Sequence, residues 1–309
     1  MPTLKSITLR SAFDGLPLDA LLLTPDVPPT GVVQLSHGMA EHKERYLPLM
    51  QALAAQGLVC FIHDHRGHGG SVRQSPEDLG HFYDATGSAV VQDLYQATTF
   101  LRARYASLPL TLLAHSMGTL IARVYLQTHD DAIQRLVLCG APGHQAAAGL
   151  GISLVRAIGR LKGDHYRSGL VQKLVFGAYS SYIPGEASPM AWLSANEENV
   201  RQYEQDPLCG FTFTCNGFGS LFSLSKNAFS RDGWQMKNPS LPIHMVAGDH
   251  DPVIGGVRGW QYSQRFLYER GYTNLSSKLY KDLRHELLLE KESPLIIRDL
   301  CAFIFAQRA

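Results

Sequence analysis

Residues 110–126, with the sequence LTLLAHSMGTLIARVYL, place Ser116 between an apolar run and a run with helical spacing. A serine hydroxyl becomes a useful nucleophile only when a neighbouring base takes its proton and backbone N–H groups face the developing oxyanion. A tight strand–turn–helix arrangement provides this, because small residues beside the serine allow a sharp turn and the helix presents its positive end. Ala114 and Gly118 are such residues, and the helical pattern begins at Thr119. The stretch therefore predicts a nucleophilic serine, although a small-x-Ser-x-Gly sequence also occurs in ordinary turns.

A nucleophilic serine in such a turn needs a carboxylate and a histidine base, which follow it in the chain at the ends of later strands. Asp249 and Asp251 come after a predicted strand, in the sequence IHMVAGDHDPV. His285 comes after the next predicted strand and is expected to open a helix. We favour Asp251 as the acid, because Pro252 fixes the path of the chain after it, and we expect Asp249 to order the loop.

The oxyanion hole of such a site needs two backbone amides. The amide of Met117 directly follows the serine. In the sequence QLSHGMAEHKERY a strand ends at His37, and Gly38 permits a turn, so that Met39 can direct its amide toward the site. His37 precedes the serine in the chain and belongs to this turn, so we expect it to support the loop rather than to act as the base.

The elements that position these residues alternate between strands and helices. Short apolar runs predict strands, and runs with apolar residues three and four apart predict helices. The predicted strands are 6–11, 19–25, 31–38, 58–64, 110–115, 135–142, 243–247 and about 277–281, and the predicted helices are 46–57, 89–105, 119–129, 260–271 and 293–307. The first two strands form a hairpin. The later strands alternate with helices, which is typical of a parallel sheet covered on both faces.

This alternation stops between residues 143 and 238, a segment that is rich in aromatic residues and glycine and is expected to be mostly helical. We therefore predict an α/β fold with a mostly parallel, doubly wound sheet, in which residues 1–142 and 239–309 form the core and 143–238 form a helical cap. Aromatic and methionine side chains of the cap are candidates for lining a pocket, but we expect most of them to pack the cap onto the sheet. They are Phe176, Tyr179, Tyr182, Met190, Trp192, Phe211, Phe213, Phe218 and Phe222.

The composition is that of a globular protein. The 309 residues are 45% hydrophobic, and 28 Lys and Arg residues balance 27 Asp and Glu residues, so nothing indicates a nucleic-acid partner. No run of eighteen apolar residues predicts a membrane span, and the first residues lack the apolar segment of a secretory signal. Five scattered cysteines fit reduced thiols rather than disulfides. We expect a cytoplasmic protein without a cofactor.

Three histidines in the sequence HDHRGH offer an alternative, a zinc site, because their spacing is similar to the H-x-H-x-D-H sequence of metallo-β-lactamase-like hydrolases. They are His63, His65 and His68. The zinc sequence requires an aspartate where this chain has Gly67. We therefore predict no metal ion here and expect Asp64 and Arg66 to hold the loop together by local hydrogen bonds.

Six sequence segments together resemble one family. They are HGMAEHKERY, DHRGHGGS, AHSMG, DPLCGF, GDHDPV and RHELLLE, and they follow one another over nearly the whole chain. The chain resembles the α/β-hydrolases of the monoglyceride lipase and lysophospholipase group, which is also described as serine aminopeptidase-like. The resemblance implies an α/β-hydrolase fold with Ser116 as nucleophile, Asp251 as acid and His285 as base. It also implies an oxyanion hole made by the amides of Met39 and Met117, a cap over an acyl pocket, and no cofactor or metal.

The chain departs at two positions from the sequence G-H-S-M-G-G that is common in this family. Ala114 stands in place of the first glycine, and Thr119, which is β-branched, stands in place of the last. Either side chain could crowd the turn at Ser116. We expect these residues to alter the turnover rate rather than to abolish activity.

These observations predict a serine ester hydrolase that forms an acyl-enzyme with esters such as monoacylglycerols, lysophospholipids or short-chain esters. Two alternatives stay open: an acyltransferase that uses the same acyl-enzyme, and a catalytically silent α/β-hydrolase fold that serves as a binding module. The expected partner is a small-molecule acyl ester or lipid. The apolar segment 146–163 carries Arg156, Arg160 and Lys162, and it is expected either to touch a membrane surface or to face the pocket.

Overall fold

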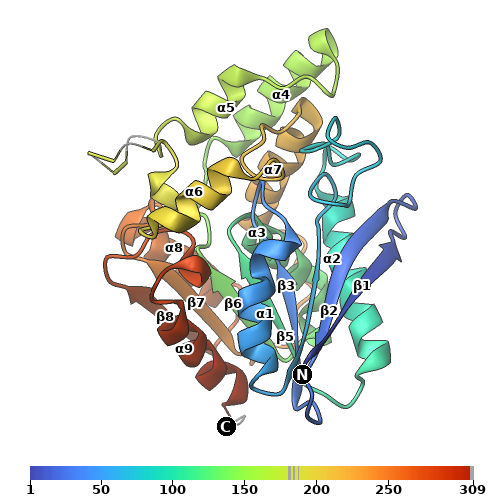
Figure 1. Ribbon diagram of the computed structural model, residues 1–309. Coiled ribbons are helices and arrows are strands. Elements are labelled where there is room, and N and C mark those ends of the chain that lie inside the picture. The colour runs from blue at the N-terminus through green and yellow to red at the C-terminus, as the bar shows by residue number, and fades with distance from the viewer. Residues whose placement is uncertain (180–181, 184, 187, 307–309) are drawn as a thin grey trace.

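The centre of the fold is an eight-stranded sheet with the strand order β1-β2-β4-β3-β5-β6-β7-β8 (Figure 1). The computed structural model describes residues 1–179, 182–183, 185–186 and 188–306. The strands are β1 (Thr3–Arg10), β2 (Pro17–Thr24), β3 (Gly31–Ser36), β4 (Leu58–His63), β5 (Leu110–His115), β6 (Arg135–Cys139), β7 (Ile243–Gly248) and β8 (Leu275–Tyr280). The pairs β1–β2 and β2–β4 are antiparallel, and the other neighbours are parallel. The predicted hairpin and the mostly parallel sheet are confirmed.

Helices cover both faces of this sheet, because successive side chains of a strand point to opposite faces. In β5, Leu113 belongs to the apolar cluster with α1 (Leu47–Ala54) and α9 (Ser293–Phe305). Its neighbours Leu112 and Ala114 belong to the cluster with the helices of the other face. Those helices are α2 (Ser88–Arg104), α3 (Met117–His129) and α8 (Gly256–Glu269). The sheet is therefore doubly wound, as the sequence predicted.

Residues 143–238, which we call the insertion, connect β6 with β7. Their regular elements in the described residues are helical: α4 (Ala148–Lys162), α5 (Gly169–Phe176), the 3₁₀ turn η3 (Ala191–Leu193), α6 (Glu197–Gln205) and α7 (Cys215–Ala228). Of these helices, α4 and α5 lie at one end of the molecule, beyond the sheet (Figure 1). Residues 180–181, 184 and 187 of the predicted cap, and 307–309 of the predicted core, lie outside the described residues.

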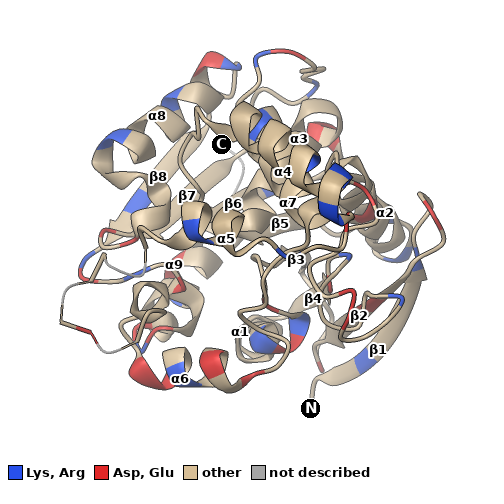
Figure 2. Cartoon of the chain, turned by 90° about the horizontal axis from the view of Figure 1, so that it is seen from above, with Lys and Arg blue, Asp and Glu red and all other residues tan. Residues whose placement is uncertain are grey.

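Charged residues of both signs surround the face that Figure 2 shows, with acidic residues in the first turn of α6 and basic residues in the last turn of α4. None of the described helices is long and apolar enough to cross a membrane.

All five cysteines are free thiols, and four of them are buried. Their environment agrees with the expectation that they behave as small apolar side chains rather than as partners in disulfides.

The loop after β4 is held by a buried ion pair. The Arg66 Nε donates to Asp93 Oδ2 on α2 over 2.7 Å, and both side chains are fully buried. Arg66 also reaches Asp14 in the turn between β1 and β2, so the expectation of purely local hydrogen bonds is wrong for this residue. It is only half right for Asp64, which accepts the amide of Gly70 within the loop but also accepts the amide and the ammonium group of Lys43 from another segment. Arg66 therefore joins its own loop to α2 and to the turn between β1 and β2.

We expect Asp93→Ala to lower the free energy of unfolding by about 3 kcal/mol, because it leaves the buried Arg66 cation with only its longer carboxylate contacts, those to Asp14. The matched control is Glu269→Ala, which removes an exposed ion pair with Arg231 and should change stability by less than about 1 kcal/mol. Urea denaturation of the two variants measures both effects. Equal changes in the two variants would contradict the importance of the buried pair.

Candidate active site

The backbone at Ser116 adopts a conformation that residues other than glycine rarely take. Ser116 has φ 50° and ψ −119°, and it lies between the end of β5 and the first residue of α3. Its amide donates to the carbonyl of Cys139 on the neighbouring strand over 3.0 Å, and its carbonyl accepts from the amide of Thr119 over 2.9 Å. Such strain persists only where surrounding contacts hold the backbone in place, and it is common at functional sites. The turn agrees with the strand–turn–helix arrangement that the sequence predicted.

The turn fits closely against β3. A Cβ atom at Gly118 would overlap the carbonyl oxygens of Ser36 and His37, so the backbone of α3 can start here only with glycine. Ala114 is fully buried within β5, and the hydroxyl of Thr119 donates to the carbonyl of Ser116 over 2.7 Å. The two departures from the common family sequence are thus accommodated, and Thr119 adds a hydrogen bond to the turn.

Three predicted site residues meet at this turn. The Nε2 atom of His285 lies 2.8 Å from Ser116 Oγ, and its Nδ1 atom lies 2.9 Å from Asp251 Oδ2. His285 and Asp251 are buried, and Ser116 is partly exposed. The ionised carboxylate can only accept, so Nδ1 carries the proton and Nε2 is free to accept from the serine hydroxyl. This arrangement can remove the serine proton and hold the resulting imidazolium beside a carboxylate.

The acid and the base come from loops after β7 and β8. Asp251 Oδ1 accepts the amide of Val253, which fixes the carboxylate. Asp249 accepts the amide of Asp282 instead and lies at the surface, so it orders the two loops as expected. His285 lies in a loop, two residues before the 3₁₀ turn Leu287–Leu289, and the expectation that it opens a helix is wrong. A loop places the ring between strand ends without the constraint of helical spacing.

The two predicted oxyanion amides belong to residues that line one cavity together with Ser116 and His285. Within the described residues, the amides of Met39 and Met117 donate no hydrogen bond to the protein. They are therefore available to an oxyanion. His37 stands behind the first of these loops: its Nε2 accepts the amide of His65 over 2.9 Å, and burial lowers its pKa to about 4. A neutral, hydrogen-bonded His37 supports the loop, as expected, and does not contact Ser116 Oγ within hydrogen-bond distance.

A buried ionic network that the sequence did not predict lies beside these residues. Arg45 Nη1 lies 2.8 Å from Glu41 Oε2 and 2.7 Å from Glu286 Oε1. His115 bridges Glu41 Oε1 and the carbonyl of His285, each over 3.2 Å. Glu41 and Arg45 stand four residues apart, a spacing that suits an ion pair, but nothing local points to Glu286.

Burial and charge compete in this network. Burial alone would raise the pKa of Glu41, but the hydrogen bond from His115 and the charge of Arg45 outweigh it and hold that pKa well below its usual range. Burial likewise lowers the pKa of His115, yet the Glu41 carboxylate outweighs burial and raises the pKa overall. The network therefore keeps the Glu41 carboxylate charged and connects it, through His115, to the carbonyl of His285.

The cavity beside Ser116 has a volume of about 680 Å³ and is lined mostly by apolar side chains of the insertion. Six of the nine aromatic and methionine residues considered above line it: Phe176, Tyr179, Met190, Trp192, Phe211 and Phe222. The expectation that most of the nine only pack the insertion onto the sheet is therefore wrong. The reason is that the loops between the helices, as well as the helices, turn side chains toward the cavity. Phe213 and Phe218 are fully buried, and Tyr182 is exposed.

The three histidines at the end of β4 and in the loop after it do not gather around one point. The ligand atoms of His63, His65 and His68 are not among the groups of described residues that approach one another within 4.8 Å. His65 Nε2 contacts Ser36 Oγ, and His68 Nε2 accepts the amide of Ala40. Burial lowers the pKa of His63 and of His68 to about 3. These rings pack beneath the loop of Met39 as neutral groups.

Comparisons with known proteins identify the family. The family described as serine aminopeptidase, S33 matches residues 27–292. A monoacylglycerol lipase of Mycolicibacterium smegmatis is 31% identical over 285 residues, which cover 91% of this chain and 90% of the relative. A monoglyceride lipase of Homo sapiens is 36% identical over 246 residues, which cover 77% of this chain and 71% of the relative. A crystal structure of a thermostable carboxyl esterase from Bacillus coagulans in complex with glycerol superposes with a TM-score of 0.88 at 23% identity, covers 98% of each chain and shows the same fold.

Two single substitutions at the Ser116 turn should affect ester turnover to very different extents. Contrary to the altered turnover expected from the sequence, Ala114→Gly should leave ester turnover nearly unchanged and cost about 0.5–1 kcal/mol of stability, because the turn already closes with alanine at this position. Gly118→Ala should lower turnover by about 10²-fold or prevent folding, because the added methyl group pushes α3 away from β3. Assays with a p-nitrophenyl ester, together with circular dichroism, measure both. Wild-type activity in Gly118→Ala would show that the close approach to Ser36 is unimportant.

Proposed function

Because this chain belongs to the serine aminopeptidase, S33 family of α/β-hydrolases and is a carboxylic ester hydrolase, we propose that it cleaves monoacylglycerols and related acyl esters with Ser116 as its nucleophile. The observation that carries the proposal is the pair of contacts made by His285, 2.8 Å to Ser116 Oγ and 2.9 Å to Asp251 Oδ2. The proposed roles are nucleophile for Ser116, general base and acid for His285, and orienting carboxylate for Asp251.

In the first half of the proposed reaction, His285 Nε2 takes the hydroxyl proton as Ser116 Oγ attacks the ester carbonyl. The amides of Met39 and Met117 stabilise the oxyanion of the tetrahedral intermediate. The imidazolium then donates its proton to the departing alkoxide, so that an alcohol leaves and an acyl group stays on the serine. Asp251 stabilises the imidazolium without taking the proton itself.

In the second half, His285 takes a proton from a water molecule that attacks the acyl-enzyme, and the fatty acid leaves after the proton returns to Ser116. An alcohol or amine in place of water would give acyl transfer by the same steps. Comparing the yields of free acid and of new ester as glycerol is added distinguishes the two activities. Neither half requires a cofactor.

The lining of the cavity favours an acyl chain over a peptide. Its walls are mostly apolar, and the carboxylates that line it, Glu41 and Glu286, are both bound by Arg45. Among the described lining residues, no carboxylate is therefore left to bind the free amino group of a peptide substrate. An ester with an apolar chain and an uncharged head group fits this surface. The relatives that are monoacylglycerol lipases support the same substrate class.

We expect Ser116→Ala to lower hydrolysis of monoacylglycerol and of p-nitrophenyl esters by about 10⁴-fold or more, because the nucleophile is lost. His285→Ala should have a similar effect. The matched control for the acid is Asp249→Asn, which should stay close to wild type, whereas Asp251→Asn should lose most activity.

A fluorophosphonate probe gives a second measurement, because it reacts covalently with an activated serine. Wild-type protein should be labelled and Ser116→Ala should not. Folded wild-type protein that resists the probe would instead support the catalytically silent binding module.

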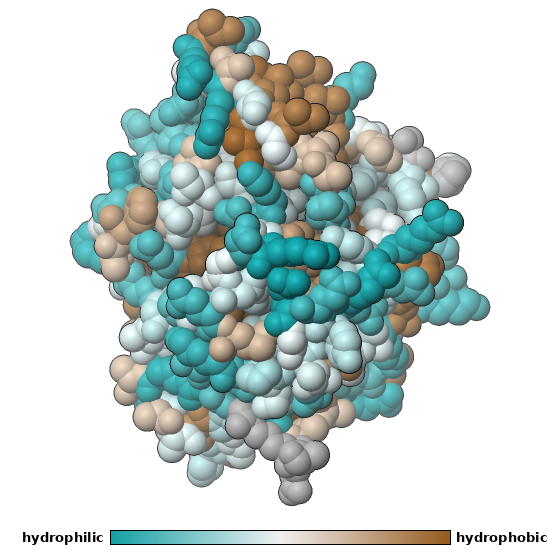
Figure 3. Space-filling model, turned by 180° about the vertical axis from the view of Figure 1, so that it is seen from behind, coloured by the Kyte–Doolittle hydropathy of each residue, from teal (hydrophilic) through white to brown (hydrophobic). Residues whose placement is uncertain are grey.

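We also propose that α4 and α5 touch a lipid surface. Leu150 and Leu161 on α4 and Leu170 and Leu174 on α5 are exposed, with exposed fractions between 60% and 87%. The apolar area over this end of the molecule is seen in Figure 3. Leu150 and Leu174 also line the cavity, so the exposed apolar surface continues into it. Basic residues on the same helices, Arg156, Arg160, Lys162 and Lys173, suit an anionic surface.

The double substitution Leu161→Ser with Leu170→Ser should weaken binding to anionic phospholipid vesicles by about tenfold, since it removes apolar area at the lipid contact. Neither residue lines the cavity, so turnover of a dissolved short-chain ester should not change. Vesicle sedimentation and ester assays measure the two properties. Val257→Ser, an exposed apolar residue on α8, is the control and should bind vesicles like wild type. Equal binding by all three proteins would contradict a contact through α4 and α5.

A further inference from the structure

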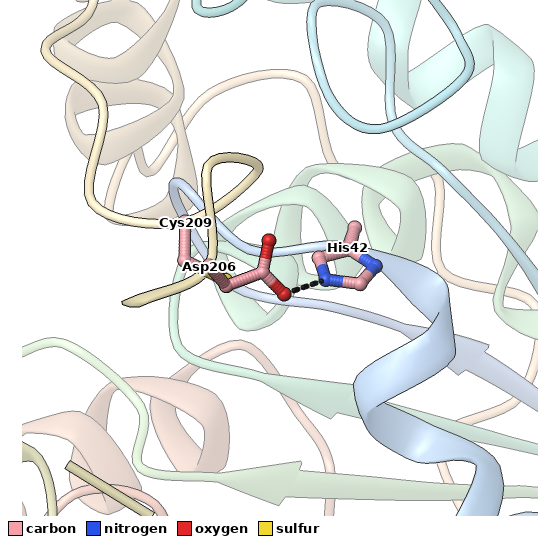
Figure 4. A group of neighbouring side chains, drawn as sticks. All are labelled: His42, Asp206 and Cys209. Carbon is pink, nitrogen blue, oxygen red and sulfur yellow. Dashed lines mark hydrogen bonds and ion pairs between the residues drawn. The ribbon is translucent and has the colours of Figure 1, made fainter. Parts of the chain in front are cut away.

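His42, Asp206 and Cys209 meet where the loop after β3 approaches the loop after α6 (Figure 4). One ligand atom from each residue, a ring nitrogen, a carboxylate oxygen and a thiol sulfur, lies within 4.8 Å of the other two. His42 and Cys209 are buried, and Asp206 is partly buried. The three side chains come from segments more than 160 residues apart and play no part in the proposed reaction. Their convergence therefore calls for a separate chemical explanation.

The donor set is that of a zinc site. Imidazole nitrogen, thiolate sulfur and carboxylate oxygen are the common protein ligands of Zn²⁺, with bonds of about 2.0–2.3 Å. Ligand atoms in a tetrahedral shell of that size are roughly 3.3–3.8 Å apart, so these donors need to move by less than about 1.5 Å to close around an ion. Mg²⁺ and Ca²⁺ select oxygen ligands and have no use for the thiol or the imidazole.

Neighbouring groups orient two of the donors. Glu44 Oε2 lies 2.7 Å from His42 Nδ1, and this contact directs the other ring nitrogen, Nε2, to Asp206 Oδ2 at 2.8 Å. A carboxylate on the second nitrogen of a ligating histidine is the usual support of protein zinc sites. The other oxygen of Asp206 accepts the amide of Leu208, which fixes the carboxylate plane. The two donors are therefore held in contact with each other, within 4.8 Å of the thiol, before any ion binds.

We propose that His42, Asp206 and Cys209 bind a Zn²⁺ ion that clamps the insertion to the loop of the oxyanion amide. Next to the cluster, the amide of Gly210 donates to the carbonyl of Ala40 over 3.0 Å, and both residues line the cavity. Zn²⁺ replaces the thiol proton of Cys209 and the proton shared by His42 and Asp206, and both protons pass to solvent. Water supplies the fourth ligand, because Asp206 is partly exposed.

Cobalt(II) is the probe for this site, since it binds the same ligands as Zn²⁺ and its complexes are coloured. Titration of the full chain without a histidine tag should give one equivalent of bound Co²⁺, with the visible bands of a tetrahedral ion and a near-ultraviolet thiolate-to-cobalt band. One equivalent of Zn²⁺ should then remove both signals. Absence of the thiolate band from wild-type protein would overturn the proposal.

Variants locate the site. Cys209→Ser should lose the thiolate band, and Asp206→Asn and His42→Gln should each bind Co²⁺ more than tenfold more weakly. Glu44→Gln, which removes the carboxylate that supports His42 and also pairs with Lys43, should weaken binding by about tenfold. The matched control is Cys215→Ser, which changes another buried cysteine of the insertion and should keep the band. A band that survives in Cys209→Ser, or that disappears in Cys215→Ser, would place the metal elsewhere and overturn the proposal.

Thermal unfolding supplies a readout that does not depend on colour. Zn²⁺ should raise the unfolding temperature of wild type and of Cys215→Ser and leave that of Cys209→Ser unchanged. Circular dichroism of each variant without metal first establishes that it is folded. Because Asp206→Asn tests the site without altering the thiol, it replaces Cys209→Ser if the latter does not fold. An equal rise in all of the folded variants would contradict the clamp.

Discussion

The strained turn at Ser116 is the constraint on which the rest of the site depends. A serine with φ 50° stays in that conformation only because the neighbouring backbone leaves it no alternative. The amide of Ser116 is bound by Cys139 on β6, and Gly118 lies directly against the carbonyls at the end of β3. Three adjacent parallel strands therefore determine where one hydroxyl points. A shift of β3 or β6 relative to β5 would move the hydroxyl of Ser116, because backbone atoms make these contacts. A change of side-chain rotamer cannot compensate for such a shift.

A buried network of charges performs the same task for the loops. Arg45 joins Glu41, behind the loop of Met39, to Glu286, next to the base His285. The amide of Glu286 donates to Leu193 in the insertion over 2.7 Å, so the network reaches all three segments that surround the cavity. Buried ion pairs add little net stability when both partners are present, but they are costly to break. Here the ion pairs of Arg45 hold the loop of Met39 and the loop of His285 in a defined relative position.

The insertion combines two properties that would conflict in an isolated helix pair. Its inner side chains make an apolar cavity, and the leucines on α4 and α5 remain exposed around it. Exposed apolar area of this kind is unfavourable in water and needs a compensating role. The proposed lipid contact supplies such a role, since the same surface could touch the lipid phase and admit the acyl chain. The proposed zinc site joins the insertion, which provides Asp206 and Cys209, to the core, which provides His42.

The sequence by itself determined the elements and the order of the reactive residues. Strand alternation and the turn at Ser116 follow from side chains within a few positions of one another, so local patterns suffice to predict them. Only the tertiary structure decided that His285 pairs with Asp251 and not with Asp249, that His285 lies in a loop, and that most of the cap aromatics line a cavity. It also revealed the partner of Arg45, a carboxylate 241 residues further along the chain. These contacts depend on how loops from separate strand ends meet in space, and no local preference of the chain encodes that meeting.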